Sequence, residues 1–128
     1  MAVVLIIEVD RIISNLCEVI LSKEHKILEA RNMPLALKLL AEDKPQLVIT
    51  DLMVPDDHRL ALNQSNALKL VNLLRKSNRQ VKILVYSVLC YEPEYRKKVI
   101  SLGADECLFN KGSLELFKLS INNLLGLE

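Results

Sequence analysis

The chain has 128 residues, 51% of them hydrophobic, and its 17 basic and 16 acidic side chains give a formal net charge of +1. This length suits one domain with a single complete core, spanning residues 1–128. A charge near zero gives no reason to expect nucleic acid or an anionic membrane as a partner. The longest unbroken apolar run, residues 1–7, is far too short to cross a membrane.

Short runs rich in Val, Ile and Leu alternate with amphipathic stretches along the whole chain. The runs predict strands at residues 3–7, 26–30, 47–50, 81–87 and 107–109. The stretches between them carry apolar residues at helical spacing: Ile12, Ile13, Leu16 and Ile20; Leu35, Leu39 and Leu40; Ala67, Leu70, Val71 and Leu74. Strict alternation of strand and helix predicts right-handed crossovers and a doubly wound parallel α/β sheet.

Several residues mark where the helices begin. Asn32 is a suitable N-cap with Pro34 in the first turn behind it. Ser113 is a suitable cap for the last helix, where Glu115 complements the helix dipole. Residues 56–66 are largely polar and predict an irregular segment that is longer than the usual connection.

The composition of the runs also predicts the order of the strands. Runs 3–7, 47–50 and 81–87 are the most continuously apolar, as expected of strands that are covered on both faces. Run 26–30 contains Lys26 and Glu29, and run 107–109 is very short; both features are typical of edge strands. A five-stranded sheet in the flavodoxin-like order 2-1-3-4-5 satisfies these preferences.

The cysteines suggest a reducing compartment. Cys17, Cys90 and Cys107 are an odd number, far apart in the sequence, and each has apolar neighbours. We therefore expect reduced, mostly buried thiols in a cytoplasmic protein. A zinc site is not expected, because there is no C-x-x-C pair and neither His25 nor His58 has ligand-like spacing to a cysteine.

The candidate reacting group is Asp51, which directly follows the apolar run 47–50 and precedes Pro55. In a parallel α/β sheet, ligands bind at the carboxyl ends of buried strands, so a carboxylate there is poorly explained by solubility. The alternative is a turn aspartate that satisfies backbone donors.

Other polar residues converge on the same edge of the predicted sheet. Glu8 and Asp10 follow the first strand, Ser87 ends the fourth, and Lys111 follows the fifth. Carboxylates together with water suit Mg²⁺, and a hydroxyl and an ammonium group suit the oxygens of a phosphoryl group. The chemistry that such a set serves is phosphoryl transfer to a carboxylate. Alternatively, Asp10 caps the helix that follows it, and Ser87 and Lys111 are a structural and a solvated residue.

These residues resemble the motifs of receiver domains of bacterial two-component response regulators, over residues 2–125. The segment 47–55 is similar to the strand of that family whose aspartate is phosphorylated by a histidine kinase, and Ser87 ends a strand as the family's Thr or Ser does. Residues 103–111 resemble the last strand and its lysine. The resemblance implies Asp51 as phosphoacceptor, Ser87 and Lys111 at the phosphoryl group, and Mg²⁺ on Glu8, Asp10, Asp51 and the backbone carbonyl of Met53.

The chain also departs from the family pattern. Val9 stands where receiver domains usually carry a second acidic residue, and Arg59 lies near the place of a common glycine. Asn110 occupies the usual place of the lysine, with Lys111 one residue later. Cys107 replaces the aromatic residue expected in the last strand. A damaged metal site would follow from Val9.

Two functions remain open from the sequence. The first is a non-enzymatic signalling switch, phosphorylated on Asp51 by a histidine kinase or a phosphotransfer protein. Its output would be contact with a downstream protein, because no DNA-binding or catalytic module follows Glu128. The second is a pseudo-receiver, which uses the same fold to bind a protein without phosphoryl chemistry. A dehalogenase-like phosphatase is a poor fit, because that class needs an aspartate at the position of Met53.

Overall fold

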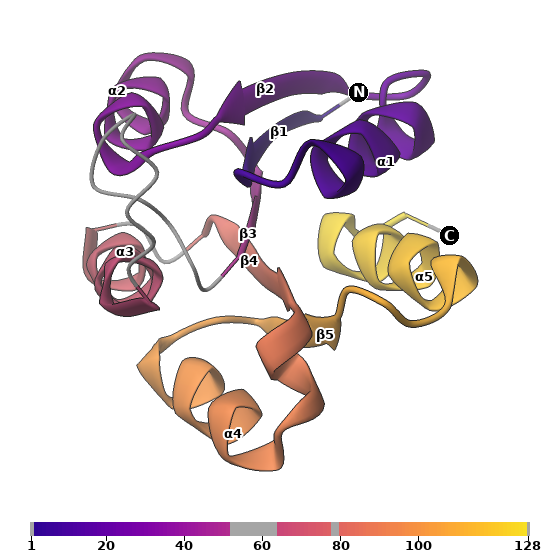
Figure 1. Ribbon diagram of the computed structural model, residues 1–128. Helices are drawn as coiled ribbons and strands as arrows, with labels where there is room; N and C mark the ends of the chain where they lie inside the picture. The colour runs from indigo at the N-terminus through magenta and orange to yellow at the C-terminus, as the bar shows by residue number, and fades with distance from the viewer. Residues whose placement is uncertain (1, 52–63, 78–79, 128) are drawn as a thin grey trace.

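The computed structural model describes residues 2–51, 64–77 and 80–127 (Figure 1). Strands and helices alternate along these residues, as the sequence predicts. In chain order they are β1 Val3–Ile7, α1 Arg11–Leu21, β2 Lys26–Ala30, α2 Met33–Asp43, β3 Leu47–Thr50, α3 Gln64–Ser77, β4 Lys82–Ser87, the short 3₁₀ helix η1 Val88–Tyr91, α4 Pro93–Leu102, β5 Glu106–Phe109 and α5 Leu114–Leu125. Among the described helices, none is both long and apolar enough to span a membrane.

The strands form one parallel sheet in the order β2-β1-β3-β4-β5. The predicted α/β doubly wound fold and the predicted strand order are therefore confirmed. Burial explains why composition was a good guide to this order. Every residue of β3 is buried, whereas all four residues of β5 and most of β2 keep some exposure, as edge strands do.

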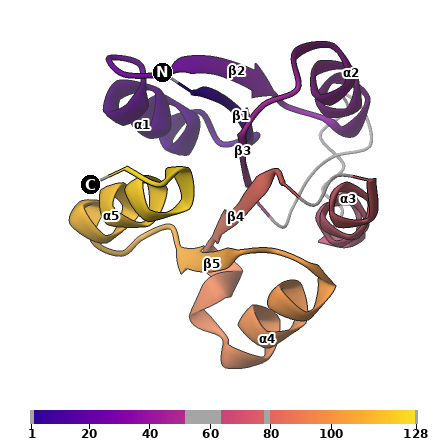
Figure 2. The ribbon, with the colours of Figure 1, turned by 180° about the vertical axis from the view of Figure 1, so that it is seen from behind.

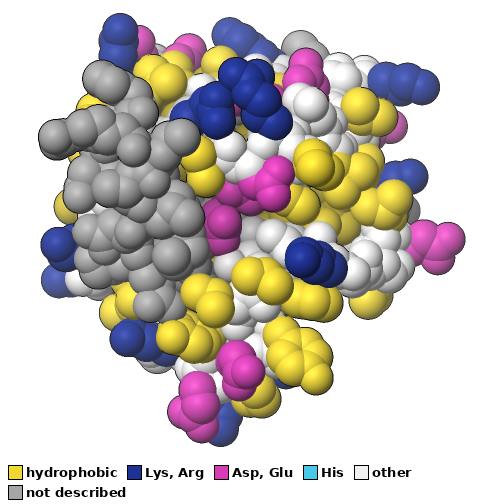
Figure 3. Space-filling view, viewed as in Figure 1, with side chains coloured by type: hydrophobic (Ala, Val, Ile, Leu, Met, Phe, Trp, Pro, Cys, Tyr) yellow, Lys and Arg dark blue, Asp and Glu magenta, His cyan; other side chains and the backbone are white. Residues whose placement is uncertain are grey.

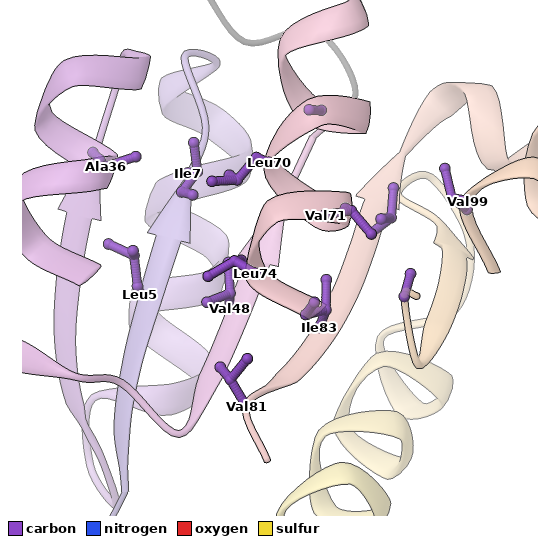
Figure 4. Packing of buried hydrophobic residues seen from close by; sticks show 14 of the residues in the cluster. Leu5, Ile7, Ala36, Val48, Leu70, Val71, Leu74, Val81, Ile83 and Val99 are labelled. Carbon is purple, nitrogen blue, oxygen red and sulfur yellow. The ribbon is translucent and has the colours of Figure 1, made fainter. Parts of the chain in front are cut away.

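Helices cover both faces of the sheet. α1 and α5 lie on one face, while α2, α3 and α4 lie on the other (Figures 1 and 2). Each layer has its own apolar cluster, because alternate side chains of a strand point to opposite faces. Figure 4 shows the larger cluster, in which Leu70, Val71 and Leu74 of α3 pack toward Val48 of β3 and Ile83 of β4.

The ends of the helices follow the capping rules. The predicted caps are confirmed: Asn32 accepts a hydrogen bond from the Leu35 amide at 2.9 Å, and Ser113 accepts from the amide groups of Glu115 and Leu116. Helix α3 begins at Gln64. The predicted irregular segment 56–66 is thus too long at its end, and its first eight residues lie outside the described part of the chain.

Two of the predicted core positions are wrong. Ile12 is 77% exposed and Leu35 is 38% exposed. In α1 the side chains turned to the sheet are those of Cys17 and Leu21, and in α2 the fully buried residue is Ala36. The remaining predicted positions Ile13 and Ile20 of α1 and Leu39 and Leu40 of α2 do pack against the clusters as partly buried residues, and the stripe on α3 is as predicted.

The expectation of three reduced thiols is also wrong. Cys90 of η1 and Cys107 of β5 form a disulfide, with their Cα atoms 5.9 Å apart, and only Cys17 is a free, buried thiol. The two cysteines are 17 residues apart in the sequence. The short η1 helix, which composition did not reveal, folds back over β5 and brings them together.

Candidate functional site

The carboxyl ends of β1 and β3 place Glu8 and Asp51 beside each other. Ile7, the last residue of β1, is paired with Thr50, the last residue of β3, so the next residues continue the same register. The Asp51 amide donates to the Ile7 carbonyl at 3.1 Å, and the Glu8 amide donates to the Ala30 carbonyl of β2 at 3.1 Å. The backbone of both acidic residues is thus held at the point where the winding of the sheet reverses.

The two carboxyl groups share a hydrogen bond, and Glu8 is only 6% exposed. Burial and, next, the charge of Asp51 raise the pKa of Glu8 from 4.5 to about 8. Both causes act against the charged form of Glu8. The raised pKa favours the protonated form of Glu8, which is the form that can donate the shared hydrogen bond to Asp51.

Glu8 also makes contacts within its own loop. Its Oε2 atom accepts from the Val9 amide at 3.0 Å and from the Asp10 amide at 3.4 Å. Asp10 is exposed and caps α1, with Oδ1 accepting from the Ile12 amide at 2.9 Å. Asp10 thus has the capping role that the sequence left open, and its role as a metal ligand stays a prediction.

An arginine that the sequence analysis missed lies at the rim of this site. Arg31 follows β2, and its Nη2 atom donates to the carbonyl oxygen of Val9 at 2.9 Å. Acidic side chains gather near the middle of this face of the molecule, with Lys and Arg side chains directly above them in the view (Figure 3). One sequence signal could have identified Arg31, because it directly follows the predicted strand 26–30 at the same edge as Glu8.

Ser87 is fully buried at the carboxyl end of β4, the strand next to β3. Its Oγ accepts a hydrogen bond from the Leu89 amide at 3.2 Å and so caps η1. Its carbonyl accepts from the Asn110 amide at 3.3 Å. Because the hydroxyl is used here as an acceptor, its own hydrogen remains available to donate.

Lys111 lies in the turn that follows β5, and its side chain is exposed. Asn110, which precedes it, is partly buried, and its Oδ1 atom finds no hydrogen-bond donor among the described residues. The turn itself is closed by the Gly112 amide, which donates to the Phe109 carbonyl at 3.2 Å. The structure thus places both residues at the end of β5, and the proposed role of Lys111 stays a prediction.

The donor set of the site is small for a metal ion. Among the residues that the structure describes, no three His, Cys, Asp or Glu side chains gather closely enough to hold one. Glu8 and Asp51 form a close carboxyl pair at this edge of the sheet. Because Mg²⁺ retains several waters and binds through one or two carboxylates, this pair fits Mg²⁺ with a reduced set of ligands.

Some of the predicted site residues cannot be placed. Met53, whose backbone carbonyl is the remaining predicted metal ligand, and Arg59 lie outside the described residues. The same holds for Asp56, Asp57 and His58, the charged and histidine residues near the start of the predicted irregular segment.

Comparison with known proteins agrees with this geometry. The family model of the response regulator receiver domain matches residues 4–119. No curated protein matches the chain. Three solved structures are similar in fold. They are a Francisella response regulator receiver domain (TM-score 0.82, 20% identity, 98% of both chains), a Clostridium difficile two-component response regulator (0.84, 18%, 98% of this chain and 97% of that one) and the BeF₃-activated DrrB receiver domain (0.84, 15%, 98% of both). The chain therefore belongs to the response regulator receiver domain family of two-component signal transduction.

Proposed function

We propose that Asp51 accepts a phosphoryl group from a histidine kinase or a phosphotransfer protein, and that the domain then signals through contact with a downstream protein. It does so in the cytoplasm as a switch and not as an enzyme, and neither nucleic acid nor a membrane is a partner of this domain. Receiver domains are signalling modules in general. The proposal assigns the signalling role of this family to the site around Asp51.

The observation that carries the proposal is the position of Asp51. It directly follows the fully buried strand β3, next to Glu8 on β1, and its carboxyl group shares a hydrogen bond with that of Glu8. The carboxylate of Asp51 lies at an edge of the sheet that a phosphoryl donor can reach. The backbone of Asp51 is held by the hydrogen bond from its amide to the Ile7 carbonyl. A backbone held in place in this way supports nucleophilic attack, because little orientational freedom has to be lost when the carboxylate reacts.

In the proposed reaction a carboxylate oxygen of Asp51 attacks the phosphorus of a phosphohistidine. The phosphorus–nitrogen bond of the donor breaks, the imidazole leaves, and an acyl phosphate forms on Asp51. Glu8 and Asp51 would hold Mg²⁺, with Asp10 and the Met53 carbonyl as further predicted ligands, and the bound ion would offset the negative charge between nucleophile and donor.

Ser87 and Lys111 have proposed roles at the phosphoryl oxygens. The buried Ser87 hydroxyl retains a hydrogen to donate, and Lys111 offers an ammonium group from the turn after β5. Movement of Ser87 toward the phosphoryl group would pull on η1, whose Leu89 amide is bonded to Ser87. The surface of β4, α4 and β5 would then change shape and alter the contact with a partner.

Beryllofluoride with Mg²⁺ tests the proposal, because it imitates a phosphoryl group on a carboxylate. We expect the amide resonances of Asp51, Ser87 and Leu89 to shift on titration, and acetyl phosphate to add one phosphoryl mass to the protein. Asp51→Asn should abolish both effects. Glu42→Gln, which removes an exposed carboxylate on α2, should change neither. An unchanged spectrum at saturating beryllofluoride would refute the proposal.

One observation favours a second function, a pseudo-receiver that binds a protein without phosphoryl chemistry. The pKa of Glu8 is raised, and its protonated form satisfies the buried Glu8 and the partly buried Asp51 by their shared hydrogen bond without a cation. Val9 moreover supplies no oxygen from its side chain. In this case Asp51→Asn would keep the affinity for the partner, and millimolar Mg²⁺ would shift no resonance of Glu8 or Asp51.

A further inference from the structure

The disulfide joins two segments that both contact Ser87. Cys90 lies in η1, which begins directly after Ser87, and Cys107 lies in the edge strand β5. The Leu89 amide of η1 donates to the Ser87 hydroxyl, and the Asn110 amide, just after β5, donates to the Ser87 carbonyl. The disulfide between Cys90 and Cys107 therefore links covalently the two segments that hydrogen-bond to Ser87.

The surroundings of Cys90 suit a thiol as well as a disulfide. Cys90 is 1% exposed and belongs to the apolar cluster beneath α3 and α4, and Cys107 packs against the same cluster. The Cys90 sulfur lies 3.5 Å from the Val85 carbonyl oxygen. In the disulfide this sulfur carries no hydrogen, but a reduced Cys90 thiol would find in Val85 an acceptor already in place. Reduction therefore leaves no buried donor unsatisfied.

We propose that Cys90 and Cys107 form a reversible redox site, which fixes η1 to β5 when oxidised and releases η1 when reduced. The consequence for Ser87 as a phosphoryl contact rests on the proposed function, whereas the redox site itself does not. In the cytoplasm, where we propose that the domain acts, disulfides are usually transient, catalytic or redox-sensing, as a bond that opens and closes would be.

The chemistry balances with ordinary cellular reagents. In oxidation, the two thiols give two electrons and two protons to hydrogen peroxide, which yields the disulfide and two waters. In reduction, one thiolate of a dithiol attacks the sulfur of Cys107, the less buried of the two cysteines. Cys90 leaves as a thiolate and takes up a proton, and the second thiol of the reductant then displaces Cys107 and closes its own disulfide.

Cys17 is an internal reference for these reactions. It is fully buried, and burial raises the pKa of its thiol to about 12, so that it stays protonated in the folded protein. Cys17 should therefore take no part in the thiol–disulfide reactions of Cys90 and Cys107. When the protein is unfolded and alkylated with a maleimide, the oxidised chain should take up one label and the reduced chain three.

When the disulfide is open, only weaker contacts hold η1 to β5. One is the contact between the rings of Tyr91 and Phe109, whose centres are 5.6 Å apart. Amide hydrogen exchange reports such local opening. We expect exchange at Leu89 and Asn110 to be at least about tenfold faster in the reduced protein, with little change in β1 and β3.

The wild-type protein supplies both states, so no variant has to fold for the test. The protein is equilibrated with dithiothreitol and then with hydrogen peroxide, its labels are counted by mass, and amide exchange is measured in each state. Cys17→Ala should keep the full redox response. The double variant Cys90→Ala, Cys107→Ala should show the amide exchange rates of the reduced protein. Neither dithiothreitol nor hydrogen peroxide should change these rates. Three labels before reduction, no closure by peroxide, or equal exchange in the two states would each overturn the redox site.

A beryllofluoride titration with Mg²⁺ in both states separates this inference from the proposed function. A larger shift of the Ser87 and Leu89 resonances in the reduced protein supports the link between the disulfide and Ser87. An equal shift in both states overturns that link. No shift in either state, together with faster amide exchange on reduction, refutes phosphorylation of Asp51 and leaves the redox site established.

Discussion

Glu8 and Asp51 lie next to each other at the carboxyl ends of two paired strands, and one hydrogen bond joins their carboxyl groups. Burial and the neighbouring Asp51 hold the pKa of Glu8 at about 8. A pair of this kind is stable without a metal only while Glu8 keeps its proton. Protons and cations therefore compete for the same site.

Glu8 should make the stability of the metal-free domain depend on pH. Its pKa is 4.5 as an ordinary glutamate and about 8 in the folded protein, so the folded state binds more protons between these values. The contribution of Glu8 to the free energy of unfolding should fall as the pH rises through this window, and it is fully present below the lower value. Urea denaturation in EDTA from about pH 5 to about pH 9 measures this.

Glu8→Gln should remove most of this dependence, because glutamine does not titrate. Asp10→Asn is the matched control, because it removes a nearby exposed carboxylate while asparagine still caps α1. The control should keep the fall in stability with pH. A wild-type stability that rises through this window would contradict the assignment of the proton to Glu8.

Val9→Asp should strengthen Mg²⁺ binding. The backbone of Val9 is held by its amide, which donates to Glu8, and by its carbonyl, which accepts from Arg31. Any side chain keeps these two bonds, so an aspartate adds a carboxylate ligand without rearranging the loop. We expect the dissociation constant for Mg²⁺ to fall by about tenfold or more, because charged oxygen ligands determine the affinity of such sites.

Calorimetric titration at about pH 8, where the proton competes less, checks this change. Val9→Asn is the control of similar size, since its side chain is neutral, and it should give a much smaller gain. Equal affinities of Val9→Asp and the wild type would mean that Val9 does not face the ion, and the metal site would then need different ligands.

The sheet could be predicted from the sequence because continuous apolar runs are a direct sign of buried parallel strands. Strand order and the placement of Glu8 and Asp51 follow from the same signal. The faces of α1 and α2 were less well predicted, since Ile12 and Leu35 extend the apolar pattern while lying on the solvent side. Periodicity alone does not show where the edge of a wide apolar stripe lies.

The parts of the site that the sequence did not reveal depend on contacts between distant segments. Nothing near Cys90 in the sequence indicates that η1 turns back over β5 to reach Cys107. Arg31 contacts the Val9 carbonyl through the pairing of β2 with β1. The raised pKa of Glu8 arises first from burial of its side chain, which the neighbouring residues in the sequence do not indicate.

Arg75 should contribute strongly to stability through three separate bonds. From α3 it donates to the carbonyl of Gly103 at 2.8 Å and to that of Val81 at 2.9 Å, and it pairs with Asp105 at 2.7 Å. Arg75→Met keeps the aliphatic stem but removes the donor of all three bonds, while Asp105 Oδ2 keeps its bond from the Ile83 amide at 2.8 Å. We expect a loss of about 2 kcal/mol in the free energy of unfolding.

Arg75→Lys separates charge from geometry, because an ammonium group cannot reach three diverging acceptors as a guanidinium group does. It should recover less than half of the loss. Lys76→Met, on the exposed side of the same helix, should cost little. Equal stability of the Arg75→Met and Lys76→Met proteins in chemical denaturation would show that the three bonds add nothing to the folded state.

Gly103 should tolerate a side chain far less well than Gly126, although both glycines end helices with positive φ angles. Gly103 has φ +120°, and a Cβ atom there would lie 2.6 Å from both Cβ and Cγ of Arg75. Gly126 has φ +72°, and a Cβ atom there would meet nothing within 4 Å. Gly126→Ala should therefore cost about 1 kcal/mol from backbone strain alone. Gly103→Ala should cost at least about twice as much, because Arg75 has to move and its bonds to Gly103 and Asp105 weaken. Thermal and urea denaturation of the two variants measure the difference, and similar losses in both would mean that Arg75 gives way without loss of its bonds.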